Sequence, residues 1–165
     1  MNITNETLFT AGSGERLPFS EVINKIESYV SEDPDNEYKV SIGTDSMTHT
    51  STLFVLAIVV HRVGKGGIFF YKRFQHDYIN NLRDKLYAET SLSISATEFL
   101  MEKLFEIDED IDSKIKLSIH LDIGETGPTK DLIKELEGWV TALGYDYAIK
   151  PDAYAASSIA DRYSK

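Results

Sequence analysis

The chain has 165 residues, 42% of them apolar, no cysteine, and a formal net charge of −10 from 17 basic and 27 acidic side chains. This length and apolar fraction exclude a disordered chain and predict one domain that buries a core without disulfides. The lack of cysteine excludes thiolate zinc sites, iron–sulfur clusters and a cysteine nucleophile, and it favours a cytoplasmic protein. The charge disfavours indiscriminate binding to nucleic acids, because that binding comes from neutralising phosphates with Lys and Arg.

The N-terminal residues lack the pattern of a secretory signal, and the longest apolar run, over residues 53–60, is too short to cross a bilayer. We therefore expect no membrane partner. Hydrophobic periodicity and turn residues predict the following elements in chain order: a flexible polar lead-in over residues 1–17, a helix over 20–30, strands over 38–45, 52–63 and 68–74, a helix over 82–105, a strand over 115–123, a helix over 128–143, a strand over 145–149 and a helix over 152–163.

This order of elements predicts a mixed α/β fold in a single domain over residues 18–165. Three strands that can pair as an antiparallel meander precede two crossovers through helices, and such crossovers require parallel pairing. The expected architecture is a five-stranded sheet with helices on both faces. The ribonuclease H-like fold has this order, and other α/β folds share it.

Glu89 occupies an unexpected position on the helix predicted over residues 82–105. On a helical wheel, Leu86, Leu92, Ala96 and Leu100 flank it within about 60° on either side, so it lies in the middle of the apolar stripe. An unpaired carboxylate buried there costs several kcal/mol, on the order of what an uncompensated charge requires. A basic partner, a raised pKa or a metal ion must compensate it.

Three aspartates follow predicted strands. Asp45 and Asp122 each come after an apolar run and before a turn, in strands that would be parallel neighbours, so both would lie at the carboxyl edge of the sheet. Asp152 follows the last predicted strand and would reach the same edge, with Asp161 as the alternative for this position. A turn-capping aspartate explains either of the first two alone, and a helix N-cap explains Asp152.

Four carboxylates at one edge would repel one another unless cations lie among them. Oxygen ligands without sulfur suit Mg²⁺ or Mn²⁺. Two such ions about 4 Å apart are a common device for in-line hydrolysis of a phosphodiester. Asp45, Glu89, Asp122 and Asp152 are thus both candidate metal ligands and candidate catalytic residues.

Five ordered motifs resemble those of the YkuK-like family of ribonuclease H-like bacterial proteins, from about Phe19 to the C-terminus: Ile42-Gly-Thr-Asp-Ser46, Gly64-Lys-Gly-Gly67, Ala88-Glu-Thr90, His120-Leu-Asp-Ile-Gly124 and Lys150-Pro-Asp-Ala-Tyr-Ala-Ala-Ser157. The resemblance implies a ribonuclease H-like fold and places Asp45, Glu89, Asp122 and Asp152 at the superfamily's acidic metal ligands. It implies no substrate. No histidine precedes Asp152 in the manner of the superfamily's proton-shuttling histidine. Lys150 stands near instead, and His49 or His76 could reach the site only by loop geometry.

A basic segment supports a nucleic-acid partner. Between residues 61 and 85 there are six Lys and Arg against two acidic residues, interleaved with aromatic side chains that can stack on bases. Lys65, Lys72 and Arg73 from this segment, with Lys150, are candidate substrate contacts. An ordinary solvated hairpin edge protected by basic residues is the structural alternative.

Two other functions fit parts of the sequence. The segment 122–130 resembles the phosphate loop of sugar kinases and actin-like ATPases, which would make the protein a nucleotide or phosphate binder. A binding module that kept the fold without activity is the other alternative. The sequence favours a nuclease that depends on Mg²⁺ or Mn²⁺ and binds two ions.

Overall fold

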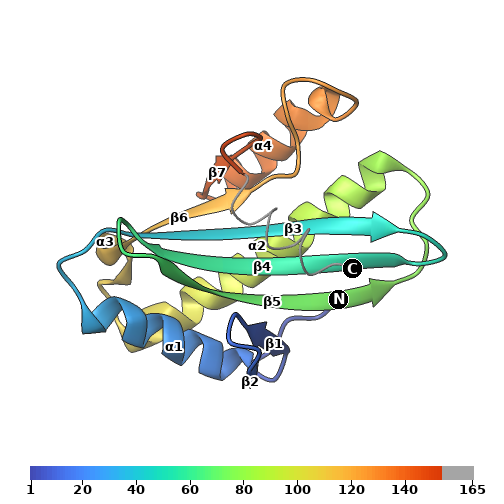
Figure 1. Cartoon of the computed structure of the whole chain (residues 1–165). Coiled ribbons are helices and arrows are strands. Elements are labelled where there is room, and N and C mark those ends of the chain that lie inside the picture. The colour runs from blue at the N-terminus through green and yellow to red at the C-terminus, as the bar shows by residue number, and fades with distance from the viewer. Residues whose placement is uncertain (154–165) are drawn as a thin grey trace.

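The structure, a computed structural model, describes residues 1–153 and contains one mixed sheet flanked by helices (Figure 1). The order of the strands across the sheet is β2-β1-β5-β4-β3-β6-β7. The strands are β1 (Leu8–Ala11), β2 (Arg16–Pro18), β3 (Tyr38–Thr48), β4 (Thr52–Arg62), β5 (Gly67–His76), β6 (Ile115–His120) and β7 (Asp146–Ala148). The helices are α1 (Phe19–Glu32), α2 (Leu82–Ile107), α3 (Ile111–Lys114) and α4 (Ile133–Ala142), with a 3₁₀ turn, η1 (Lys130–Leu132), before α4.

The predicted mixed α/β sheet is confirmed. Strands β3, β4 and β5 form a long antiparallel meander, and β6 and β7 add to it in parallel. The meander forms because β-branched and aromatic residues fill β4 and β5, and a Gly-Lys-Gly-Gly turn joins the two strands.

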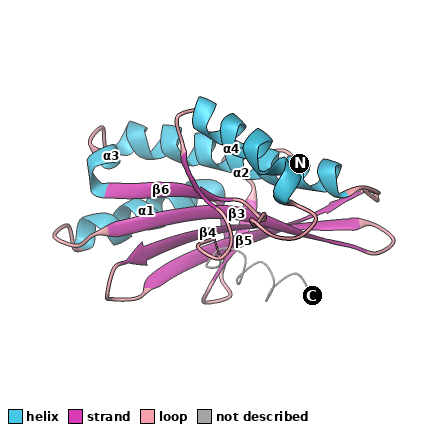
Figure 2. Ribbon diagram, turned by 90° about the horizontal axis from the view of Figure 1, so that it is seen from above, coloured by secondary structure: helices cyan, strands magenta, loops and turns pink. Residues whose placement is uncertain are grey.

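The described helices pack on one face of the sheet (Figure 2). The larger core cluster joins α1 and α2 to alternate residues of the meander, such as Ile42, Ile58 and Phe70. A second cluster packs α4 against α2 and the end of β6, through residues such as Leu86, Ile119 and Leu136. Helices were expected on both faces, and the last predicted helix, 152–163, lies outside the described residues from position 154 onwards.

Three expectations need correction. The sheet has seven strands rather than five, because Leu8–Ala11 and Arg16–Pro18 form an antiparallel ribbon that pairs with β5. Residues 1–17 are therefore not a flexible lead-in as expected, and Phe9 in this segment is fully buried. The helix expected from Pro128 begins later, as a 3₁₀ turn at Lys130.

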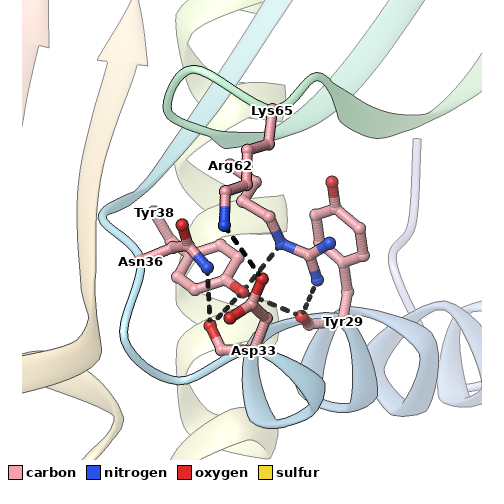
Figure 3. A network of polar contacts seen from close by, with 6 residues as sticks. All are labelled: Tyr29, Asp33, Asn36, Tyr38, Arg62 and Lys65. Atoms are coloured by element: carbon pink, nitrogen blue, oxygen red, sulfur yellow. Dashed lines mark hydrogen bonds and ion pairs between the residues drawn. The ribbon is translucent and has the colours of Figure 1, made fainter.

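A polar network holds the C-terminal end of α1 against β4 (Figure 3). The guanidinium of Arg62 lies 3.9 Å from the ring centre of Tyr29 and donates to the Tyr29 carbonyl (2.7 Å) and the Tyr38 hydroxyl (2.9 Å). The Tyr38 hydroxyl donates to the carbonyl of Asp33 at 2.7 Å. These bonds satisfy carbonyls that a helix end leaves without partners, so α1 is fixed to the meander.

Within residues 1–153, none of the helices is both long and apolar enough to cross a bilayer.

Candidate metal centre

The candidate site lies where β3 and β6 separate. The last parallel pair between these strands joins Gly43 to His120, after which β6 ends while β3 continues to Thr48. Asp45 lies two residues beyond this pair on β3, and Asp122 lies two residues beyond it after β6. The same alternation of side chains therefore directs both carboxylates into the opening between the two strands.

Helix α2 brings the third carboxylate. The hydroxyls of Thr44 and Ser93 share a buried hydrogen bond of 2.7 Å, which ties the helix to β3. Glu89 lies one helical turn before Ser93, so the same contact directs it toward β3. There the hydroxyl of Ser46 donates to Oε2 of Glu89 at 3.0 Å.

The three carboxylates form a compact group. Asp45, Glu89 and Asp122 each offer an oxygen atom, and these atoms all lie within 4.8 Å of one another. Glu89 is 5% exposed, and among the described residues its buried Oε1 has no hydrogen-bond partner. Burial raises the pKa of Glu89 well above its usual value, and the charges of Asp122 and Asp45 raise it further.

Lys150 is the basic side chain of this group. Its Nζ lies 2.7 Å from Oδ1 of Asp122, and the side chains are 54% and 19% exposed respectively. The hydrogen bond to Asp122 raises the pKa of Lys150, with partial burial opposing it and the charges of Asp45 and Glu89 adding to it. This single ammonium leaves most of the negative charge of the three carboxylates uncompensated.

Two neighbours of the group were not singled out by the sequence. Ser46 follows Asp45 directly, so strand alternation already directed it to the helix-covered face, where it meets Glu89. His120 is buried two residues before Asp122, and its Nδ1–H donates to the carbonyl of Ala153 at 3.2 Å. Burial lowers the pKa of His120, and that hydrogen bond opposes the shift. In the sequence, only the position of His120 two residues before Asp122 indicated that it lies near the site.

The other predicted site residues are distributed over the sheet. Asp152 is exposed in a turn and is not part of the compact group in residues 1–153, and Asp161 lies outside the described residues. Arg73 pairs with Val55, which pairs with Asp45, so Arg73 emerges on the same sheet face two strands from Asp45. Lys72 occupies the next row, toward the opposite face.

Lys65 does not belong to this region. It lies in the turn between β4 and β5 and pairs with Asp33 at 3.5 Å. That turn is beside Tyr38 at the start of β3, seven residues before Asp45, or about 23 Å along an extended strand. The structure therefore separates Lys65 from the three carboxylates.

The segment 122–130, which resembles a phosphate loop, is partly closed by its own contacts. The backbone N–H of Gly124 donates to the hydroxyl of Thr129 at 3.3 Å, and Asp122 is paired with Lys150. A 3₁₀ turn, rather than the first turn of an α-helix, follows at Lys130. These features give no support to nucleotide binding through this segment.

The three carboxylates fit a hard divalent cation. They supply oxygen ligands alone, as Mg²⁺ and Mn²⁺ prefer. The buried Oε1 of Glu89, which lacks a partner among the described residues, is directed into a group of like charges. A bound cation would compensate this charge and give that oxygen a ligand role.

Comparison with known proteins agrees with this arrangement. A family model described as "Ribonuclease H-like" matches residues 21–165. The "Uncharacterized protein YkuK" of Bacillus subtilis (strain 168) is 35% identical over 167 residues, covering 96% of this chain and 97% of that protein. No solved structure matches. The matched residues include all of α2, β3 and β6, and the chain belongs to the ribonuclease H-like family.

Proposed function

We propose that the protein is a cytoplasmic nuclease that hydrolyses phosphodiesters with Mg²⁺ or Mn²⁺ held by Asp45, Glu89 and Asp122. One observation carries the proposal. Oxygen atoms of three carboxylates from three separate elements converge within 4.8 Å, and one of them is buried with an oxygen that lacks a partner among the described residues. A purely structural group would instead be expected to neutralise such an oxygen with a basic or hydroxyl partner.

The chain's own residues would prepare the site for this chemistry. A bound divalent ion supplies a Lewis acid that favours deprotonation of water and neutralises charge on the phosphate. Asp45 and Asp122, each about half-buried, would hold the ion from the two strand ends. Ser46 fixes one oxygen of Glu89, so the other would remain directed at the ion.

Asp152 is the proposed fourth ligand, because it follows Lys150, the partner of Asp122, by two residues and because the resemblance to the YkuK-like family implies an acidic ligand there. Asp152 lies in an exposed turn that begins at Lys150, near the end of the described chain. We expect Asp152→Asn to lower cleavage less than Asp45→Asn, since three carboxylates already converge without it.

Basic residues beside the site support a nucleic acid as the substrate. Arg73 shares a sheet face with Asp45, two strands or about 10 Å away. A groove of about 430 Å³ runs beside it, with Arg16, Lys72 and Arg73 in its lining. Arg73, which shares the face of Asp45, and Arg16 would contact phosphates of a strand whose scissile bond lies at the carboxylates.

A cleavage panel tests the proposal. RNA–DNA hybrid, single strands and branched junctions are incubated with the wild type and Asp45→Asn in Mn²⁺. Asp35→Asn is the matched control, because Asp35 is exposed in the turn before β3, at the other end of the meander. We expect cleavage by the wild type and the control and its loss in Asp45→Asn. Cleavage by Asp45→Asn equal to that of the wild type, or no cleavage by the wild type, would refute the proposal.

A further inference from the structure

The backbone holds Lys150 beside the carboxylates. Past the end of the β6–β7 ladder, the N–H of Leu121 donates to the carbonyl of Ala148 at 2.9 Å, and the N–H of Lys150 donates to the carbonyl of Ile123 at 2.8 Å. These two bonds bracket Asp122. The side chain of Lys150 therefore starts next to Asp122, and its ion pair at 2.7 Å is a preorganised contact rather than a chance surface pair.

The ion pair occupies an oxygen that a second ion would need. A second divalent ion would need oxygen ligands of its own among these carboxylates. Glu89 has Oε2 engaged by Ser46, and Asp45 Oδ1 accepts the N–H of Ser46 at 2.8 Å. Asp122 has Oδ1 paired with the Lys150 ammonium. The hydrogen bonds from Ser46 leave those oxygens a lone pair for a metal ion, whereas the Lys150 ammonium at Asp122 Oδ1 is itself a cation and repels another.

The net charge of the site also bears on how many divalent ions it holds. With three ionised carboxylates, the Lys150 ammonium and Asp152 as the proposed fourth ligand, the site carries a net charge of −3, which one divalent ion lowers to −1. A second ion would leave the site positive, with an ammonium and two divalent cations inside a few ångströms, and like charges this close repel strongly. We propose that Lys150 takes the place of a second metal ion, so that the site holds one divalent cation together with the Lys150 ammonium. This inference rests on the metal site of the proposed function and narrows it.

The placement also gives Lys150 a role toward substrate. Its side chain is 54% exposed, so part of the ammonium faces solvent beside the carboxylates. Lysine binds phosphate as a compact point charge with three donors. The Lys150 ammonium would therefore contact the phosphate oxygen that a second ion would otherwise neutralise.

Counting bound Mn²⁺ tests the proposal without any cleavage assay. Calorimetry and electron paramagnetic resonance of free Mn²⁺ give the number of ions per chain for the wild type, Lys150→Met and Lys150→Arg. We expect one ion in the wild type, two in Lys150→Met and one in Lys150→Arg. Lys116→Met is the matched control and should bind one ion, because Lys116 lies on β6 and its exposed side chain pairs with Glu37.

The outcomes separate the two proposals. Two ions in the wild type, or one in Lys150→Met, would overturn the role of Lys150 and leave the nuclease proposal standing. Absence of Mn²⁺ binding in the wild type would overturn the metal site itself, and with it both proposals.

Discussion

Glu89 destabilises the metal-free protein. Its carboxyl group is buried against two other carboxylates, and the hydroxyl of Ser46 is the hydrogen-bond donor that reaches it within the described residues. Ionised, such a group carries an unfavourable free energy that a bound cation would remove. Such an unfavourable free energy is expected of the proposed metal site, which would fold before its ion binds.

We expect Glu89→Gln to stabilise the metal-free protein at pH 7 by about 1–3 kcal/mol, because the amide removes a buried charge. The free energy of unfolding is measured by urea titration in EDTA. Glu102→Gln, an exposed change on the same helix, is the control and should leave stability nearly unchanged. In saturating Mn²⁺ the order should reverse, since the wild type gains the free energy of binding.

The same pair of proteins should differ with pH. The pKa of Glu89 is raised in the folded state, so between its unfolded pKa, about 4.3, and its folded pKa the native protein binds more protons than the unfolded chain. The wild type should therefore lose stability relative to Glu89→Gln as the pH rises through that window, and the difference should then level off. A difference that stays constant from pH 4 to 8 would contradict the raised pKa.

At this scale the sequence revealed residues that break a pattern. Glu89 interrupts an apolar stripe, and Asp45 and Asp122 end apolar strands, so each was detectable without coordinates. Ser46 and His120 break no pattern, because a serine or histidine at a strand end is ordinary. Which carboxylate Lys150 pairs with depended on backbone bonds beyond the end of β7, and periodicity carries no such information.

At the scale of elements, the contact between α2 and β3 positions Glu89. The buried hydrogen bond between Thr44 and Ser93 fixes how far the helix slides along the strand. Thr97 adds a bond from its hydroxyl to the carbonyl of Ser93 at 2.7 Å, so the polar residues of this interface are satisfied together.

We expect Ser93→Ala to lower stability by about 1–3 kcal/mol, because it leaves the buried Thr44 hydroxyl without its partner. It should also weaken Mn²⁺ binding, since Glu89 loses its alignment with Asp45. Unfolding and Mn²⁺ titrations measure the two effects. Ser95→Ala, exposed on the same helix, is the control. Unchanged Mn²⁺ affinity in Ser93→Ala would show that this bond does not position the site.

The N-terminal ribbon was the element that sequence reasoning missed. Strands of four and three residues are too short to show a clear period of two, and polar residues surround the few apolar ones. The ribbon is nevertheless part of the core. Phe9 is fully buried, with its ring centre 4.7 Å from that of Phe19, which lies 5.1 Å from the ring centre of Phe99 on α2.

We expect Phe9→Ala to cost about 3–5 kcal/mol, as removal of a buried phenyl ring usually does. Leu8→Ala should have little effect, because Leu8 is 43% exposed on the same strand. Thermal and urea unfolding of the two variants measure the contrast. Similar losses for both would mean that the ribbon contributes through its backbone pairing rather than through Phe9.

On the scale of the whole molecule, a net charge of −10 coexists with a local basic groove. The mixture of parallel and antiparallel strands could be predicted from the order of helices and strands in the sequence. The N-terminal ribbon at the edge of the sheet could not. In the sequence, the basic residues between positions 61 and 85 form one segment, but the fold separates them. Arg73 lies toward the carboxylates, and Lys65 lies at the other end of the meander, paired with Asp33.

We expect Arg73→Ala to weaken binding of a labelled oligonucleotide and to lower the slope of log affinity against log salt by about one, as the loss of one phosphate contact should. Lys65→Ala should change neither quantity. Fluorescence anisotropy in EDTA measures both without cleavage. Equal losses in the two variants would indicate attraction to overall charge rather than a track beside Asp45.

The pairing of β1 with β5 also bears on aggregation. The ladder between them covers β5 at Phe70 and Tyr71, so among the described residues the rest of β5, from Lys72 to His76, is an open edge. An open edge can template a strand from another copy, and charged side chains are a common protection against it. Salt weakens such protection. The cations proposed to hold nucleic acid would thus also keep copies of the chain apart, and a bound nucleic acid would shield the same edge.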